Sequence, residues 1–248
     1  MKKYAIISDI HGNRGALEAV LADIRTHAVR KIINLGDALY GPLDPAGTAE
    51  RLMDLNIMSV WGNEDRIIYS APANEPSPTL QYVRCRLNRE QVEWLSRLPG
   101  TAIIDSVLFA CHASPRSDTE YFFWHIHPEG PVLRDGREME KMIEEVSSRV
   151  VLCGHDHVPR SLFLNDGILV VDPGSVGLQA FQDEAPYRHI MQNHSPHARY
   201  TILTEDKGTW HAEHQKVAYD WEAASVLAGE NGRADWAFWL RTGKVKAD

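Results

Sequence analysis

Short apolar runs alternate with helical repeats of apolar positions over the first sixty residues. Apolar runs occur at 4–8, 31–35 and 57–60. The stretches between them, 15–26 and 45–55, carry apolar residues every three or four positions, which is the period of a helix. Strand and helix in alternation predict βαβ units, with a parallel sheet covered by helices.

The pattern changes after residue 66 and favours antiparallel pairing. Hairpins are predicted at 101–111, 161–171 and 200–216, a strand at 150–153, and helices at 89–98, 138–146, 221–227 and 234–241. The stretch 178–198 is predicted to be irregular. We therefore expect two sheets packed together with helices outside. We expect a single domain over 1–248, with inserts at about 66–99 and 115–136.

Composition narrows the classes of partner. The chain has 26 Lys+Arg against 34 Asp+Glu, a net charge of −8, which argues against duplex nucleic acid as the main partner. No apolar run reaches the roughly 18 residues of a membrane span, so no membrane partner is expected. Three cysteines without a CxxC pair favour reduced thiols and a cytoplasmic protein. The oligomeric state stays open.

Five short segments place Asp, Asn or His directly after a predicted strand. They are Ser8-Asp9-Ile10-His11, Gly36-Asp37, Gly62-Asn63-Glu64-Asp65, Cys111-His112 and Gly154-His155-Asp156-His157. In an open α/β sheet, ligands bind outside the carboxyl ends of the strands. We therefore expect these side chains to converge on one crevice.

Their chemistry fits a pair of divalent metal ions. Imidazole suits Zn, Fe and Ni, whereas carboxylate suits Mn and Mg. Two ions bring four positive charges, and Asp9 and Asp37 remove two, which leaves the charge that a phosphate group needs. Two ions about 3.5–4 Å apart can hold both an attacking hydroxide and the phosphoryl oxygens. We expect two divalent ions, with Mn favoured and Fe, Ni, Zn or Mg as alternatives.

The order DxH, GD, GN, H, GHxH resembles the calcineurin-like metallophosphoesterase superfamily from about Lys2 to Gly177. The segment 172–177, DPGSVG, resembles a turn of its small bacterial phosphodiesterase-type members. The resemblance implies a four-layer αββα sandwich of two mixed sheets flanked by helices. It also implies seven metal ligands. Asp9, His11 and His157 would hold the first ion, Asn63, His112 and His155 the second, and Asp37 would bridge them.

The resemblance further implies roles around the ions. Asn63 and His112 would help to hold the phosphoryl oxygens, and Asn13 would flank the pocket. One departure concerns the leaving group, because Glu64 stands where many relatives carry a histidine that assists its departure. Two nearby cations should keep Glu64 ionised, and an ionised carboxylate cannot donate a proton. We expect Glu64 to position other groups, with general acid catalysis as the alternative.

Three further side chains are candidates for substrate contact. Arg66 and Arg116 each follow a ligand segment closely and are interpreted as phosphate contacts or, alternatively, as surface charges. His125 lies in the aromatic stretch 121–128, and it either donates the proton that Glu64 cannot or is a solvated lid residue.

Other aromatic and imidazole side chains are given structural roles. Trp236 and Trp239 are expected to pack in the core, and His189 to lie on a loop surface.

These observations predict a metal-dependent phosphoesterase. It would hydrolyse a small phosphodiester or activated phosphate ester by attack of a metal-bridging hydroxide. The enzyme alternatives are a phosphomonoesterase and a dinucleoside polyphosphate hydrolase. The alternative from another class is a non-catalytic metal-binding interaction protein on the same fold.

Overall fold

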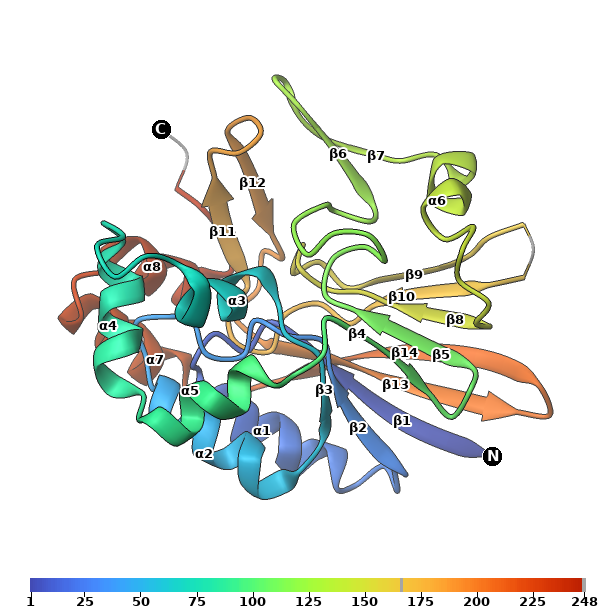
Figure 1. Cartoon of the computed structure of the whole chain (residues 1–248), viewed down its shortest axis with the longest axis horizontal. Coiled ribbons are helices and arrows are strands. Elements are labelled where there is room, and N and C mark those ends of the chain that lie inside the picture. Colours follow the sequence, from blue (N-terminus) through green and yellow to red (C-terminus); the bar gives the residue numbers. More distant parts are fainter. Residues whose placement is uncertain (166, 247–248) are drawn as a thin grey trace.

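Two five-stranded sheets face each other in the computed structural model, which describes residues 1–165 and 167–246 (Figure 1). The first sheet has the order β14-β13-β1-β2-β3. Its strands are β1 (Lys2–Ile7), β2 (Lys31–Asn34), β3 (Met58–Ser59), β13 (Ala198–Asp206) and β14 (Thr209–Val217). β1, β2 and β3 run parallel, as the alternating first sixty residues predict, and β13 joins β1 in the antiparallel sense.

The second sheet has the order β4-β5-β8-β10-β9. Its strands are β4 (Thr101–Ile104), β5 (Leu108–Cys111), β8 (Val150–Leu152), β9 (Arg160–Phe163) and β10 (Leu169–Asp172). The three central strands are parallel, and the two edge strands are antiparallel to their neighbours. The carboxyl ends of β5 and β8 therefore lie at the same edge of this sheet.

Alternation along β1 divides the apolar core into two layers. Tyr4 and Ile6 pack between the sheets with residues such as Leu152, whereas Ala5 and Ile7 pack against the helices. All four β1 side chains are fully buried. Because successive side chains of a strand point to opposite faces, one strand contributes to both layers.

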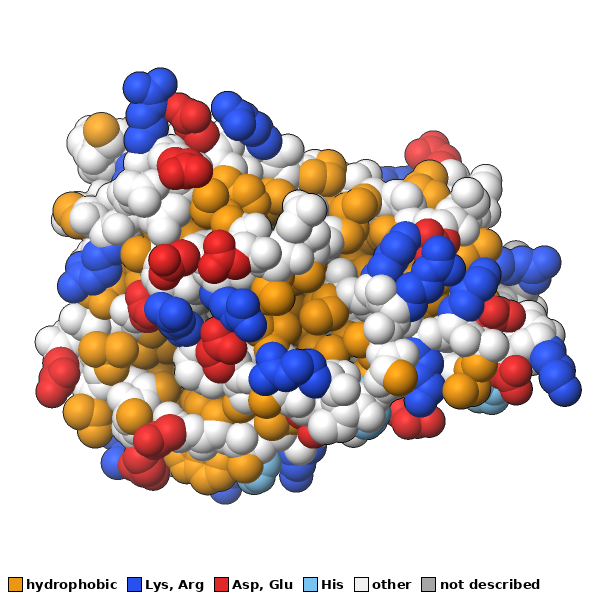
Figure 2. All heavy atoms as spheres, turned by 90° about the horizontal axis from the view of Figure 1, so that it is seen from below, with side chains coloured by type: hydrophobic (Ala, Val, Ile, Leu, Met, Phe, Trp, Pro, Cys, Tyr) orange, Lys and Arg blue, Asp and Glu red, His pale blue; other side chains and the backbone are white. Residues whose placement is uncertain are grey.

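Five helices cover the outer face of the first sheet. They are α1 (Arg14–Ile24), α2 (Pro45–Leu55), α3 (Asn63–Ser70), α4 (Pro78–Arg86) and α5 (Arg89–Ser96). The stretch 66–99, expected to be an insert, lies within this layer, and its Leu80, Val83 and Leu95 are fully buried. Figure 2 shows the molecule from below, with exposed hydrophobic atoms in the middle and charged side chains of both signs around them.

The outer face of the second sheet is covered by α6 (Gly136–Met142) and by Phe122 and Phe123. The four-layer αββα sandwich is thereby confirmed. The stretch 115–136, expected to be an insert, contains the hairpin of β6 (Trp124–His127) and β7 (Gly130–Leu133). None of the helices in the described part of the chain is long and apolar enough to cross a membrane.

The expectation of an irregular stretch at 178–198 is wrong. This stretch forms a hairpin of β11 (Ala180–Asp183) and β12 (His189–Gln192), which rises beside the C-terminal helices (Figure 1). The two helices predicted near the C-terminal end are confirmed as α7 (Trp221–Glu230) and α8 (Ala234–Thr242). Both share an apolar cluster with β11. An isolated hairpin is marginally stable in water, so the packing of β11 against these helices stabilises a hairpin that the local sequence pattern does not predict.

Candidate metal centre

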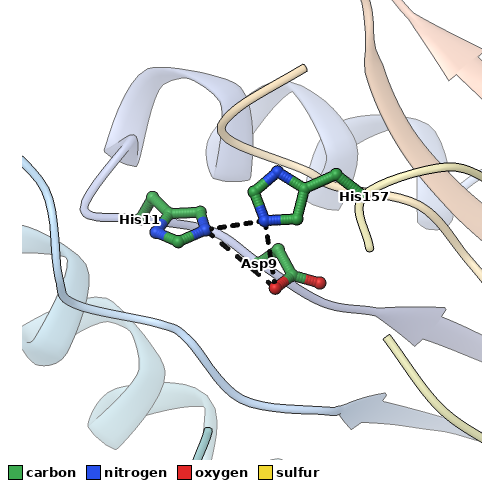
Figure 3. A group of neighbouring side chains, drawn as sticks. All are labelled: Asp9, His11 and His157. Carbon is green, nitrogen blue, oxygen red and sulfur yellow. Dashed lines mark hydrogen bonds and ion pairs between the residues drawn. The ribbon is translucent and has the colours of Figure 1, made fainter. Parts of the chain in front are cut away.

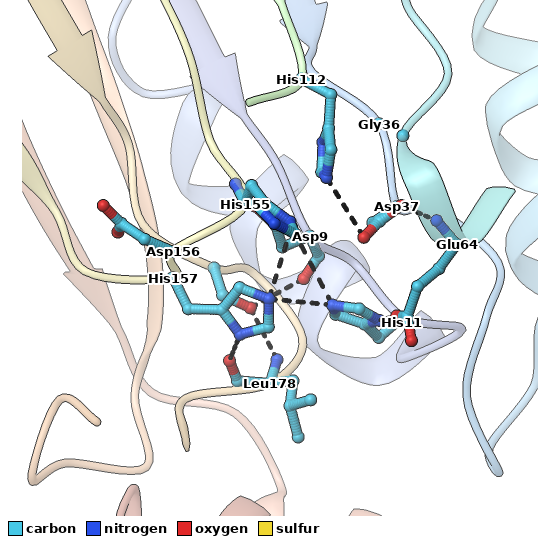
Figure 4. Close-up of polar contacts among 12 residues, drawn as sticks. Asp9, His11, Gly36, Asp37, Glu64, His112, His155, Asp156, His157 and Leu178 are labelled. Carbon is cyan, nitrogen blue, oxygen red and sulfur yellow. Dashed lines mark hydrogen bonds and ion pairs between the residues drawn. The ribbon is translucent and has the colours of Figure 1, made fainter. Parts of the chain in front are cut away.

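The predicted ligands converge where strand ends of both sheets meet (Figure 4). Six of them follow a strand, and one begins a helix: Asp9 and His11 come after β1, Asp37 after β2, His112 after β5, His155 and His157 after β8, and Asn63 is the first residue of α3. Five of the seven side chains are buried, and Asn63 and His155 are partly exposed. The fold therefore brings residues almost 150 positions apart into one polar centre.

One group of donor atoms comes from Asp9, His11 and His157 (Figure 3). The Nε2 atoms of His11 and His157 lie 3.1 Å apart, and His157 Nε2 lies 3.4 Å from Asp9 Oδ1. Asp9 is fully buried, yet its Oδ1 has no hydrogen-bond donor among the described residues. Buried carboxylate oxygens are normally satisfied, so an oxygen that faces two imidazole nitrogens suits a cation site.

A second group comes from Asp37, His112 and His155. His112 Nε2 lies 3.2 Å from Asp37 Oδ2, and the side-chain amide of Asn63 lies 3.0 Å from the same nitrogen. His155 and His157 therefore belong to different groups of donor atoms, as the resemblance implies. Asp37 also forms a third group with His11 and Glu64, which places its carboxylate between the other two.

Three of the histidines are held in the tautomer that a metal ligand needs. Each Nδ1 donates to a backbone carbonyl oxygen: His11 to Tyr40 (2.9 Å), His112 to Leu35 (2.9 Å) and His157 to Leu178 (2.7 Å). A carbonyl oxygen only accepts hydrogen bonds, so Nδ1 carries the proton. When the ring is neutral, as metal binding requires, the lone pair of Nε2 then faces the centre, as in metal sites whose ligands are oriented by outer contacts.

The backbone of the ligand loops adopts an unusual conformation. Five non-glycine ligands have positive φ angles: Asp9 (55°), His11 (53°), Asp37 (49°), His155 (75°) and His157 (65°). Such conformations cost on the order of 1–3 kcal/mol each and cluster at functional sites. Gly36 (φ 100°) lets the loop approach α3, because a Cβ there would lie 2.4 Å from the nitrogen of Gly62. The ligand loops therefore reduce the stability of the fold, and in return their backbone directs the ligand side chains into the centre.

The charges of this centre favour a cation. Burial opposes ionisation of Asp9, but the imidazole of His157 holds the pKa of Asp9 well below its usual range. Burial also opposes a charge on His112, but the Asp37 carboxylate raises the pKa of His112 to about 10. Burial lowers the pKa of His155 to about 4, with the charge of His112 acting in the same direction. Ionised carboxylates and the neutral imidazole of His155 thus face the same space.

Glu64 contacts the ring of His11 at Nδ1, the nitrogen that faces away from the centre. Its Oε2 lies 3.2 Å from Nδ1 of His11, the atom that also donates to Tyr40. The Glu64 side chain is 28% exposed and lines the cavity. Burial raises the pKa of Glu64 to about 7, although the hydrogen bond with His11 opposes that rise. This contact is the arrangement expected of a positioning residue, because it orients the imidazole of His11.

Sequence reasoning missed Asp65, which organises the loops around Asp37. Its fully buried carboxylate accepts hydrogen bonds from the backbone nitrogens of Ala38, Leu39 and Gly62. Burial raises the pKa of Asp65 to about 6. The feature of the sequence that could have indicated Asp65 is its position in the ligand segment Gly62-Asn63-Glu64-Asp65.

The four predicted substrate contacts lie apart from the described residues that line the central cavity. Asn13 caps α1 and donates to the carbonyl oxygen of Gly177. The other three are engaged by acidic side chains: Arg66 by Asp118, Arg116 by Glu144 and His125 by Glu138. None of the four lines the cavity. This arrangement gives no support to the prediction that they contact substrate.

The cavity at the centre, of about 220 Å³, has a second wall that the motifs do not indicate. Five of the predicted ligands (His11, Asp37, Asn63, His155 and His157) form one side together with Glu64. The other is formed by the β11–β12 hairpin, the segment before it and the start of α8, through Leu178, Phe181, Gln182, Asp183, Arg233, Trp236 and Trp239. Trp236 and Trp239 are buried in an apolar cluster as expected, and they also line the cavity.

The surface role expected for His189 is wrong. Its side chain is 3% exposed, and its Nε2 lies 2.9 Å from the hydroxyl of Tyr121. The residue begins β12, whose alternation turns His189 and Met191 inward. The burial of His189 could not be predicted because β12 itself was not predicted, and only a strand's alternation assigns side chains to a buried face.

Comparisons with known proteins agree with the geometry. An uncharacterized protein of Methanocaldococcus jannaschii is 27% identical over 194 residues, which cover 70% of this chain and 75% of the relative. The crystal structure of a metallophosphoesterase from Sphaerobacter thermophilus shares the fold, with a TM-score of 0.76 and 24% identity, over 98% of this chain and 99% of that one. The model of the calcineurin-like phosphoesterase superfamily domain matches residues 2–192. That match covers the ligand segments and most of the chain, which therefore belongs to the calcineurin-like phosphoesterase superfamily.

Proposed function

We propose that the protein is a metal-dependent phosphoesterase that hydrolyses phosphodiesters or activated phosphate esters. The observation that carries the proposal is the pair of donor groups that Asp37 connects, with the Nε2 atoms of three histidines facing the centre. Asp9, His11 and His157 would hold one ion, Asn63, His112 and His155 the other, and Asp37 both. A pair of divalent ions, with Mn favoured, supplies an activated water and neutralises phosphate charge.

The chain's own residues have defined tasks in this proposal. The backbone carbonyls of Tyr40, Leu35 and Leu178 hold the imidazoles in one tautomer. The amide of Asn63 lines the cavity and can hold a phosphoryl oxygen. Glu64 keeps the ring of His11 in place.

A leaving oxygen of high pKa, such as an alkoxide, must gain a proton when its bond to phosphorus breaks. His125 does not line the cavity, so solvent water is the proposed source. Esters whose leaving groups need little protonation should therefore react best, which favours diesters and aryl esters over alkyl monoesters.

The test combines metal content with turnover. The protein is stripped with a chelator, reloaded separately with Mn, Fe, Ni, Zn and Mg, and assayed on bis-p-nitrophenyl phosphate, p-nitrophenyl phosphate, a sugar phosphate and a dinucleoside polyphosphate. We expect two ions per chain and the fastest turnover on the diester. Two bound ions without turnover on any of these would favour the non-catalytic metal-binding alternative.

A further inference from the structure

The cavity at the metal centre adjoins a second hollow. This distal hollow, of about 470 Å³, is lined by Gln182, Arg233, Ala234, Asp235, Phe238, Trp239, Val245 and Lys246. Gln182, Arg233 and Trp239 line both spaces. A ligand held at the metal centre can therefore extend past these three side chains into the distal hollow.

The distal hollow is built by residues outside the ligand segments. α8 and the residues after it supply seven of its eight lining positions if Arg233, the residue that precedes α8, is included. These positions lie beyond residue 192, where the match to the superfamily domain ends. Trp236 fixes α8 beside the metal centre, because its ring meets the ring of His11 edge-on at 5.7 Å.

Arg233 is held rigidly at the junction of the two spaces. Its Nε and Nη2 donate to the carboxylate of Asp235 at 2.9 and 2.7 Å, and its Nη1 donates to the hydroxyl of Thr79. The guanidinium also lies over the ring of Trp236, at 5.3 Å. A guanidinium has five N–H donors, and these contacts use three. Among the described residues the other two donors have no hydrogen-bond partner, so they remain for a ligand, and the guanidinium is already oriented.

A second cation lies farther along the distal hollow. The ammonium of Lys246 lies 5.1 Å from the ring centre of Phe238, and its side chain is exposed. Among the residues that line this hollow, Arg233 and Lys246 carry two positive charges and Asp235 one negative charge. The distal hollow is therefore net positive in a protein whose net charge is −8.

A planar guanidinium with free donors and a nearby ammonium match the oxygens of a phosphate group. We propose that the distal hollow binds a second phosphate group of the substrate, separate from the one that is hydrolysed. This inference rests on the proposed phosphoesterase function and narrows it to compounds that carry two phosphate groups. Arg233 would bind the second phosphate, and Lys246 would add attraction from the solvent side.

A matched pair of ligands isolates the second phosphate. Thymidine 5′-monophosphate and thymidine 3′,5′-bisphosphate differ by that group alone, and their binding to the Mn-loaded protein can be measured by calorimetry without turnover. We expect the bisphosphate to bind about tenfold more tightly, an effect of one well-placed charge contact. Arg233→Gln should remove this preference, and Lys246→Gln should reduce it about twofold. Equal binding of the two ligands by the unaltered protein would overturn the proposal.

Controls separate this proposal from the proposed function. Arg241 is exposed on α8 and lies outside both spaces, so Arg241→Gln should keep the full preference. The p-nitrophenyl esters of thymidine 5′-phosphate with and without a 3′-phosphate test turnover with one leaving group. Preferential binding of the bisphosphate without turnover of either ester would retain the second phosphate site and refute the phosphoesterase. Turnover of both esters with equal KM values would refute the site and retain the enzyme.

Discussion

The two sides of the cavity are built in different ways. The ligand side consists of polar side chains at strand ends, with left-handed backbone at Asp9, Asp37 and His157 and with fixed hydrogen bonds behind the rings. The opposite wall consists of ordinary packing residues such as Phe181 and Trp239, which lie on a hairpin and a helix. Replacing one ligand leaves buried charges at the centre uncompensated, whereas replacing a residue of the opposite wall changes the shape of the cavity. Under the proposed function, we therefore expect metal binding to depend on the ligand side and substrate choice to depend on the opposite wall.

The largest expected effect is the loss of the connecting carboxylate. Asp37→Asn removes the negative charge between the two donor groups, so the protein should lose metal and activity together. An ion is worth several kcal/mol in the transition state, and activity should therefore fall at least about a hundredfold. Metal analysis and turnover of bis-p-nitrophenyl phosphate give the result.

The wall supplies the matched control for that variant. Asp183→Asn changes a carboxylate that lines the cavity from the opposite side, and it should keep both ions. Two ions and full activity in Asp37→Asn would show that the ligand side is assigned wrongly.

The next effect concerns pH in protein freed of metal. The pKa of His112 is raised to about 10 against the Asp37 charge, so the folded state holds this proton more tightly than the unfolded state. The resulting stability is fully present below about pH 6.5 and is lost as the pH rises through about 10. The melting temperature of chelated protein should therefore fall over that range.

The variant His112→Asn lacks this titrating group, so its melting temperature should depend less on pH over the same range. Metal loading should act in the opposite direction, because bound ions need neutral imidazoles and displace protons. A melting temperature of the chelated protein that rises steadily from pH 6.5 to 10 would contradict the assignment.

A smaller effect is expected at Glu64. Glu64→Gln keeps an oxygen that can accept from Nδ1 of His11, so kcat/KM on an activated aryl ester should change by less than about tenfold, or roughly 1.4 kcal/mol of barrier. General acid catalysis typically contributes about 10²–10⁴-fold and matters most for poor leaving groups. Rates across aryl esters of rising leaving-group pKa should therefore show a small, flat loss. A loss that steepens to about a thousandfold would identify Glu64 as the acid.

The smallest effect is expected at Arg116, which follows a ligand segment but lies outside the cavity. Its guanidinium is paired with Glu144 at 2.8 Å, and both side chains are about half exposed or more. Exposed ion pairs contribute little, so Arg116→Gln should change kcat/KM by less than about twofold. A tenfold rise in KM with unchanged metal content would restore Arg116 as a phosphate contact.

Sequence reasoning reached the ligand side far better than the wall. Asp9, Asp37 and His112 are recognisable because each follows an apolar strand and carries a side chain that divalent ions prefer. Arg233 and Trp239 have no comparable signal, since a tryptophan on a helix is usually a packing residue. Their place at the cavity depends on how α8 packs against β11.

What the sequence by itself determined is the set of donor atoms and their common edge of the fold. Parallel strands of one sheet end at the same edge, so the βαβ pattern brings Asp9 and Asp37 together. His155 follows a strand of the second sheet, and it joins them because the two sheets pack with these edges together. Only the tertiary structure decided the tautomers and the opposite wall. The carbonyl of Leu178 holds His157, and Trp236 lies against His11, more than 200 residues away along the chain. Such contacts depend on how separate elements pack, and spacing along the chain does not encode the packing of segments so far apart.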